Sequence, residues 1–146
     1  MTRLLTTGLA LGLGAAIAAC APSAPTPSLA DGSLMALVRG ASQAEAEQIA
    51  ARISHRPLGS RENPVRADMP AGQRAYLTRL RCSDGRAPVF SRGGSAGVGP
   101  YGSMLDVYEA NCAAGGSPAS AEIFIDMYRS GHVESKTVPG FTIVAP

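Results

Sequence analysis

Two four-residue segments near the C-terminus carry the side chains best suited to chemistry. They read Leu-Asp-Val-Tyr and Ile-Asp-Met-Tyr, and each places a carboxylate two residues before a phenol: Asp106 before Tyr108, and Asp126 before Tyr128. Alternate side chains of a β-strand share a face. If both segments are strands, each therefore presents one acid and one phenol on a single face.

The loop between the segments decides how these side chains meet. With the loop centred near Ser117, Asp106 faces Tyr128 and Tyr108 faces Asp126, close enough for hydrogen bonds between phenol and carboxylate. A shift of two residues would instead bring the two carboxylates together. Both arrangements gather the four side chains into one candidate polar pocket.

Two interpretations of this pocket remain open. In the first, the acids and phenols form a polar network that satisfies itself beneath a disulfide, as buried polar groups normally do. In the second, His132 and Glu134 join them, and Asp106, Asp126 and His132 serve a small hydrolase or a metal-dependent enzyme. No His or Cys spacing typical of a known metal site is present, so we expect no metal and no cofactor. The network is favoured, and no residue is assigned a catalytic role.

A glycine-rich segment, residues 93–102, contains two strings that resemble functional motifs. Residues 93–97 match Gly-x-Ser-x-Gly and residues 97–102 match Gly-x-Gly-x-x-Gly. A nucleophile elbow and a dinucleotide fingerprint both need a strand before the motif and a helix after it. Here a strand-like segment follows, so the sequence predicts a loop over Gly93–Gly102 and neither function.

The elements that must position the pocket are a hairpin and a helix. Residues 104–112 and 122–129 read as antiparallel strands, whose alternation collects a second, apolar face. A helix is predicted to begin at Ser42, because Ser42 and Glu45 form a capping box, and to cover that face. The apolar face consists of Leu105, Val107, Ile123, Ile125 and Met127.

Three further segments complete the expected fold. Asn63–Asp68 is predicted as a short edge strand with Pro64 at its start. Gln73–Cys82 fits both a helix and a strand, and the turn residues at 83–85, followed by a strand-like run, favour a strand over Leu77–Cys82. A last strand is predicted over Phe141–Val144. The fold class is α+β: one N-terminal helix packed on a small, mostly antiparallel sheet.

The N-terminus has a different character. Arg3 precedes an apolar stretch over residues 4–17, which is too short for a permanent membrane span. The residues Ile17-Ala18-Ala19-Cys20 resemble the lipobox of bacterial lipoproteins. The resemblance implies that residues 1–19 are a type II signal peptide, that Cys20 is acylated, palmitate included, and that the mature protein is anchored to a membrane. Ala21, in place of Asp, implies the outer membrane, facing the periplasm.

The next residues are expected to be a tether. Residues 20–32 combine the lipidated Cys20 with a stretch rich in Pro, Ala and Ser, which cannot bury enough apolar surface to fold. One small globular domain is then predicted over 33–146.

Cysteine count and charge support an exported protein. With Cys20 set aside for lipid, Cys82 and Cys112 remain as a pair, for which a disulfide is the natural interpretation.

Positive charge is concentrated in one segment, because Arg52–Arg92 contains nine arginines against three acids. This excess is balanced by acids elsewhere, or it forms a basic face toward an anionic envelope polymer or lipid headgroups. No motif for nucleic acid is visible.

A weaker resemblance covers about the last 85 residues. The run Arg74–Gly85, the Gly-Pro-Tyr-Gly segment at 99–102, the Asp-x-Tyr strands and Pro139–Thr142 are similar to an uncharacterised group of small exported bacterial proteins. This resemblance implies no activity, and it agrees with a bridge from Cys82 to Cys112.

Taken together, the sequence favours a non-enzymatic envelope lipoprotein, a binding or structural module. Its expected partners are the membrane, through the lipid, and an anionic envelope polymer or another envelope protein. The alternative is a small periplasmic hydrolase or metal-dependent enzyme that uses Asp106, Asp126 and His132.

Overall fold

The computed structural model describes residues 40–146, which form an α+β arrangement of two helices and a mostly antiparallel five-stranded sheet. The predicted signal peptide, Cys20 and the tether lie outside the described residues, as does the start of the predicted domain at residue 33. Within the described part, the expected fold class is therefore confirmed as α+β.

The main sheet has the strand order β3-β4-β5-β1-β6. Only the pair of β1 with β5 is parallel, and the other neighbours run antiparallel. A separate pair joins β2 (Leu80–Arg81) to β7 (Thr142–Ile143), which places a strand inside the predicted terminal segment. The main strands are β1 (Val65–Asp68), β3 (Val89–Val98), β4 (Met104–Asn111), β5 (Ser120–Asp126) and β6 (Tyr128–Val133).

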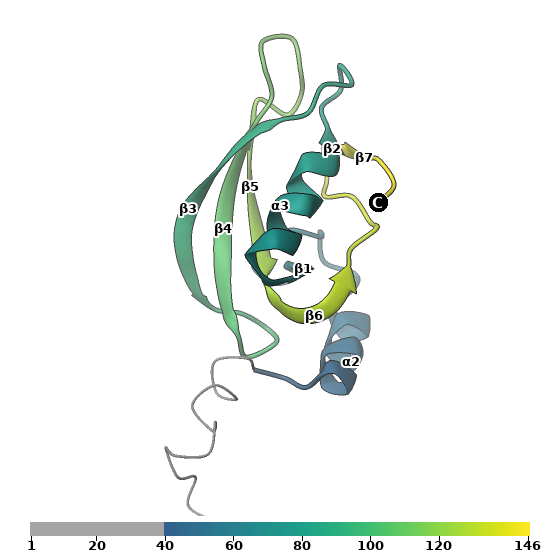
Figure 1. Cartoon of the computed structure of the whole chain (residues 1–146), viewed down its shortest axis with the longest axis vertical. Coiled ribbons are helices and arrows are strands. Elements are labelled where there is room, and N and C mark those ends of the chain that lie inside the picture. The colour runs from purple at the N-terminus through teal and green to yellow at the C-terminus, as the bar shows by residue number, and fades with distance from the viewer. Residues whose placement is uncertain (1–39) are drawn as a thin grey trace, which may run out of the picture.

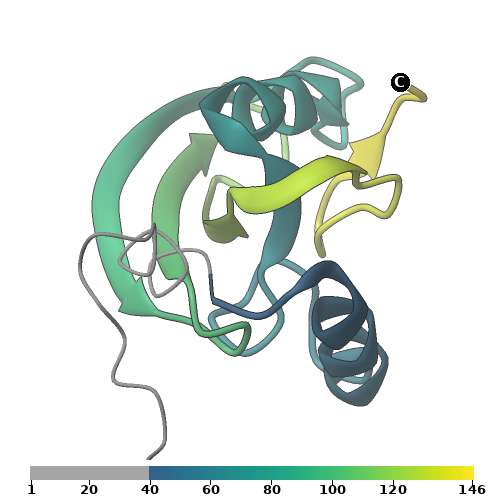
Figure 2. The ribbon, with the colours of Figure 1, turned by 60° about the horizontal axis from the view of Figure 1, so that its bottom comes forward.

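The sheet bows around one helix, α3 (Met69–Arg79), as Figure 1 and the turned view of Figure 2 show. The buried side chains of this helix are Gln73, Tyr76 and Leu77. They meet the inner face of the sheet in one apolar core, which includes Val65, Leu80, Tyr108, Ile123, Ile125 and Phe141.

The expectation of a strand over Leu77–Cys82 is therefore wrong for most of its length. Helix α3 continues to Arg79, and only Leu80 and Arg81 are extended. Gln73, Tyr76 and Leu77 repeat at helical spacing, so one stripe of α3 buries all three against the sheet. Tyr76, Thr78, Leu80 and Cys82 would equally share one face of a strand, and tertiary packing decides between helix and strand.

The N-terminal helix α2 (Gln43–Ile53) begins as predicted. The backbone N–H of Glu45 donates to Ser42 Oγ at 3.4 Å, and the N–H of Ser42 donates to the Glu45 carboxylate at 2.9 Å, which completes the capping box. Ala46 is the buried residue of α2. The helix that packs into the bowed sheet is α3, whereas this role was expected of α2.

The hairpin of β4 and β5 is confirmed, but its register differs from the expected one. Leu105 pairs with Asp126 and Asp106 pairs with Ile125, so the loop centres at residues 115–116. Because this differs from the expected register by an odd number of residues, side chains change faces. Asp106 points to the same face as Ile125, and Asp126 points to the opposite one.

Two other strands differ from expectation. β1 is flanked by β5 and β6, so it is not an edge strand; Pro64 precedes its first residue and costs the ladder no hydrogen bond. The predicted loop over Gly93–Gly102 is mostly strand, because β3 continues to Val98. The pairing of β3 with β4 accommodates the glycines through two register shifts, one between Arg92 and Gly94 and one between Ser95 and Val98.

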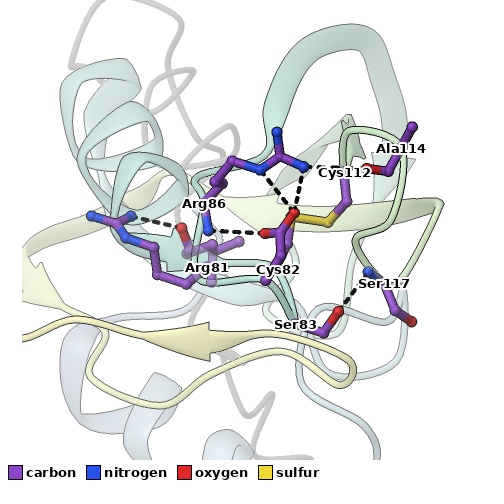
Figure 3. Close-up of a disulfide and its surroundings, with 9 residues drawn as sticks. Arg81, Cys82, Ser83, Arg86, Cys112, Ala114 and Ser117 are labelled. Atoms are coloured by element: carbon purple, nitrogen blue, oxygen red, sulfur yellow. Dashed lines mark hydrogen bonds and ion pairs between the residues drawn. A yellow bond between two sulfur atoms is a disulfide. The ribbon is translucent and has the colours of Figure 1, made fainter.

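The disulfide between Cys82 and Cys112 is confirmed, with 6.0 Å between the two Cα atoms. Figure 3 shows the disulfide and its surroundings. The predicted turn after Cys82 is held by the Gly85 N–H, which donates to the Cys82 carbonyl at 2.9 Å. The Arg86 side chain donates to Asp84 and to the Ala114 carbonyl. The bridge therefore ties the turn before β3 to the loop after β4.

We expect the double variant Cys82→Ser, Cys112→Ser to lose about 2–5 kcal/mol of unfolding free energy, because the unfolded chain regains the freedom of a loop of 30 residues. Denaturant titration of the full chain measures this. Reductant should lower the stability of the unmodified chain and leave the double variant unchanged. Two free thiols from these positions in denatured, oxidised protein would contradict the bridge.

Candidate functional site

Asp106 lies under α3 in a closed polar network. Gln73 Nε2 donates to one carboxylate oxygen at 2.9 Å, and Arg92 donates to the other at 2.6 Å. The Tyr108 hydroxyl completes the set by donating to Gln73 Oε1 at 2.9 Å. Both oxygens of Asp106 and both ends of the Gln73 amide are thus occupied, as the interpretation as a satisfied network requires.

Two opposing effects act on the pKa of Asp106. Burial raises the pKa, but the hydrogen bonds from Arg92 and Gln73 and the charge of Arg92 outweigh it, so the pKa lies below its ordinary value. Asp106 is therefore ionised at neutral pH, and each of its carboxylate oxygens accepts a hydrogen bond that stabilises the charge.

Asp126 lies on the opposite face of the sheet and has different partners. Its Oδ2 accepts from Ser103 Oγ at 2.6 Å and from Arg129 Nε at 3.0 Å. Its Oδ1 accepts from the backbone N–H of Tyr128 at 2.9 Å. Arg129 also donates to Ser103 and to the carbonyl of Ala41. This second network is buried, with Asp126 at 0% and Arg129 at 2% exposure.

The structure thus separates the predicted pocket into parts. Asp106 and Tyr108 share Gln73, whereas Asp126 contacts Tyr128 through the backbone of that residue. His132 and Glu134, which were expected to join the acids and phenols, instead contact each other, with His132 Nε2 3.4 Å from the Glu134 carboxylate. Within residues 40–146, no group of three or more His, Cys, Asp or Glu side chains is placed to hold a metal ion.

A cavity of about 440 Å³ lies where α3, β1 and β6 meet, and we refer to it as the α3–β6 cavity. Small residues leave this space open, because Gly72 and Ala75 of α3 and Ala67 of β1 line it. This cavity was not expected from the sequence, since it requires α3 to be a helix and β6 to turn back beside β1. Its remaining lining residues are Arg66, Tyr76, Thr78, Arg79, His132, Val133, Glu134 and Pro146.

Arg79 is the fixed cation of this cavity. Its guanidinium donates to three carbonyls: Glu134 at 2.6 Å, Val144 at 3.4 Å and Ala75 at 3.3 Å. It also lies 5.8 Å from the centre of the Tyr76 ring. Among the described residues, no carboxylate is within ion-pair distance of it, so its positive charge is not neutralised.

His132 and Glu134 supply a second polar point. Burial raises the pKa of Glu134, but hydrogen bonds from His132 and from the backbone N–H of Lys136 outweigh it and hold the pKa below its ordinary value. Burial also raises the pKa of Tyr76, whose hydroxyl donates to the Lys136 carbonyl at 3.1 Å. The polar groups at the rim are therefore held in place by the segment that follows β6.

An apolar cavity with one uncompensated cation and a fixed His–Glu pair suits the binding of a small apolar molecule with a polar end. The fold and the cavity define the chain as a disulfide-linked α+β protein with a pocket lined by α3, β1 and β6. No protein-family model, curated protein or solved structure matches it.

The contribution of Asp106 to the free energy of unfolding should depend on pH. A carboxyl whose pKa is depressed on folding contributes stability above its unfolded pKa, about 3.9, and loses it as the pH falls through the folded value. We expect Asp106→Asn to lower the unfolding free energy by about 1–3 kcal/mol at pH 6, with a smaller difference at pH 2.5.

Urea titration at both pH values measures this difference. Glu122→Gln is the matched control, because Glu122 is an exposed carboxylate on the neighbouring strand β5. An equal loss at pH 6 and pH 2.5 would show that the Asp106 charge does not contribute.

Proposed function

We propose that the folded part of this protein is a non-enzymatic binding module that holds a small, mainly apolar molecule in the α3–β6 cavity. We further propose that it is a lipoprotein, anchored through Cys20 to the outer membrane and facing the periplasm. Its ligand would then be an envelope component.

The cavity is the observation that carries the binding proposal. Its volume of about 440 Å³ is within the range of about 300–1,000 Å³ typical of small-molecule sites. Apolar and small side chains dominate the lining, and Arg79 and His132 provide convergent polar groups. Burial of apolar ligand surface would supply the affinity, and the polar groups would orient the ligand.

The positions of the two acids favour binding over catalysis. Asp106 and Asp126 point to opposite faces of the sheet, so one substrate cannot contact both. Each acid also has its oxygens occupied by internal donors. A hydrolase that uses Asp106, Asp126 and His132 together would need a different register of β4 and β5.

The lipid anchor is supported by the sequence around Cys20 and by the proline-rich tether, which would let the folded part stand away from the membrane. Within residues 40–146, neither helix has the length and apolar character that a membrane crossing requires.

The binding proposal can be tested with anilinonaphthalene sulfonate, a fluorescent probe with apolar rings and one anionic group. We expect saturable fluorescence with one site per full chain. Ala75→Leu fills part of the cavity from α3 and should weaken binding about tenfold or more, while the helix keeps a favourable residue.

Ala51→Leu is the matched control, because it makes the same change on an exposed position of α2, away from the α3–β6 cavity. Equal affinity in Ala75→Leu and the unmodified chain, with both variants folded by circular dichroism, would exclude the cavity as the probe site.

The anchor has an independent test. We expect Cys20→Ser to abolish acylation and release the protein from the membrane, since serine has no thiol to receive the lipid. Growth with a clickable palmitate analogue, followed by in-gel detection and membrane fractionation, measures both effects. Label retained on the serine variant would reject Cys20 as the acylated residue.

A further inference from the structure

A second, smaller cavity of about 160 Å³ shares Arg66 and Glu134 with the α3–β6 cavity. The end of α2, strand β1 and residues 134–137 line it, and we refer to it as the α2–β1 cavity. Its lining is more polar than that of its neighbour. Arg56 and Arg66, from the arginine-rich segment noted in the sequence, line the α2–β1 cavity.

Tyr101 is the most informative residue of this cavity. Its side chain is 2% exposed, and its ring lies 5.0 Å from the Arg129 guanidinium. The Tyr101 hydroxyl has no hydrogen-bond partner among the described residues. Every polar side-chain atom there that is fully buried does have one. The hydroxyl must therefore open onto accessible space, and the α2–β1 cavity is the space that Tyr101 lines.

The hydroxyl is available as a donor at neutral pH. Burial, the largest influence, raises the pKa of Tyr101, so the phenol keeps its proton. A buried tyrosine whose hydroxyl has no protein partner normally has one from outside the protein.

Three cations surround the same space: Arg56, Arg66 and Lys136. Arg66 is 15% exposed and donates to Glu47 at 2.8 Å, and its other N–H groups have no acceptor among the described residues. Arg56 and Lys136 have no carboxylate within ion-pair distance in the described part of the chain.

The one acid of the cavity, Glu134, offsets only part of this positive charge, and Arg66 is the cation of the lining that acts on it. The Glu134 carboxylate already accepts from His132 at 3.4 Å and from the backbone N–H of Lys136 at 3.1 Å. Three positive side chains against one carboxylate leave the lining with a net positive charge, which favours a negative ligand.

We propose that the α2–β1 cavity binds a single oxyanion group, a phosphate or a carboxylate. The Tyr101 hydroxyl and the free N–H groups of Arg66 hold it, and Arg56 and Lys136 neutralise it from the rim. Arginine N–H groups match the paired oxygens of both anions. A volume of about 160 Å³ accommodates such a group with a few waters and excludes a large molecule.

Calorimetric titration of the full chain with inorganic phosphate and, separately, with acetate tests the proposal, with chloride adjusted to hold the ionic strength constant. We expect one saturable site for at least one of the two anions. The anion with the higher affinity shows whether the site takes a phosphate or a carboxylate.

Two pairs of variants locate the site. Tyr101→Phe removes only the hydroxyl and should weaken binding about tenfold, the effect of one hydrogen bond to a charged group, while Tyr128→Phe should not. Arg56→Gln should weaken binding similarly, and Arg74→Gln, which removes the same charge from an exposed position on α3, should leave it unchanged.

Three results would each overturn the proposal. The first is the absence of saturable binding for both anions. The second is equal affinity in Tyr101→Phe and the unmodified chain. The third is an equal loss in Arg56→Gln and Arg74→Gln, which would indicate general attraction to a basic surface. Because the dye probe reports on the α3–β6 cavity, the two sites can fail separately.

Discussion

The buried ion pair between Asp126 and Arg129 is the constraint on which the rest of the structure depends. The two charges lie 2.9 Å apart with almost no exposure, at the point where β5 ends and β6 begins. Removing one partner of such a pair typically lowers the free energy of unfolding by about 3–5 kcal/mol, because the other charge is left buried without a counter-ion. Arg129 also reaches Ser103 and Ala41, so one guanidinium joins the turn before β4, the residues before α2 and the bend after β5.

That bend decides where both cavities lie. After Met127 the chain turns around the end of β1, so that β5 and β6 flank the same strand on its two sides. The segment after β6 then carries Glu134 to the boundary between the two cavities. Arg79 holds this segment to α3 through the Glu134 carbonyl. Asp126 and Arg129 line neither cavity, yet they hold the bend that places this shared segment, and Arg129 lies against Tyr101 of the α2–β1 cavity.

Much of the local structure could be predicted from the sequence, because it depends on neighbouring residues. The capping box at Ser42, the hairpin of β4 and β5, and the pairing of Cys82 with Cys112 all follow from short-range patterns or from counting. The faces of β4 and β5 could not be predicted, because an odd change of register exchanges them and the loop length alone does not fix it. Residues 73–80 fit both periodicities, and only packing against the sheet selects the helix. The cavities depend on that helix, so no sequence pattern pointed to them.

The glycines of β3 have a consequence for how copies of this protein meet. β3 is the outermost strand on its side of the sheet, it is ten residues long, and Val89 and Val98 on it are largely exposed. A regular strand of this kind would offer a row of unpaired N–H and C=O groups on which another chain could add. Here Gly94 and Gly97 take positive φ angles and the ladder is interrupted twice, so the row is irregular. The irregular edge of β3 is therefore a poor template for edge-to-edge pairing with another copy of this chain.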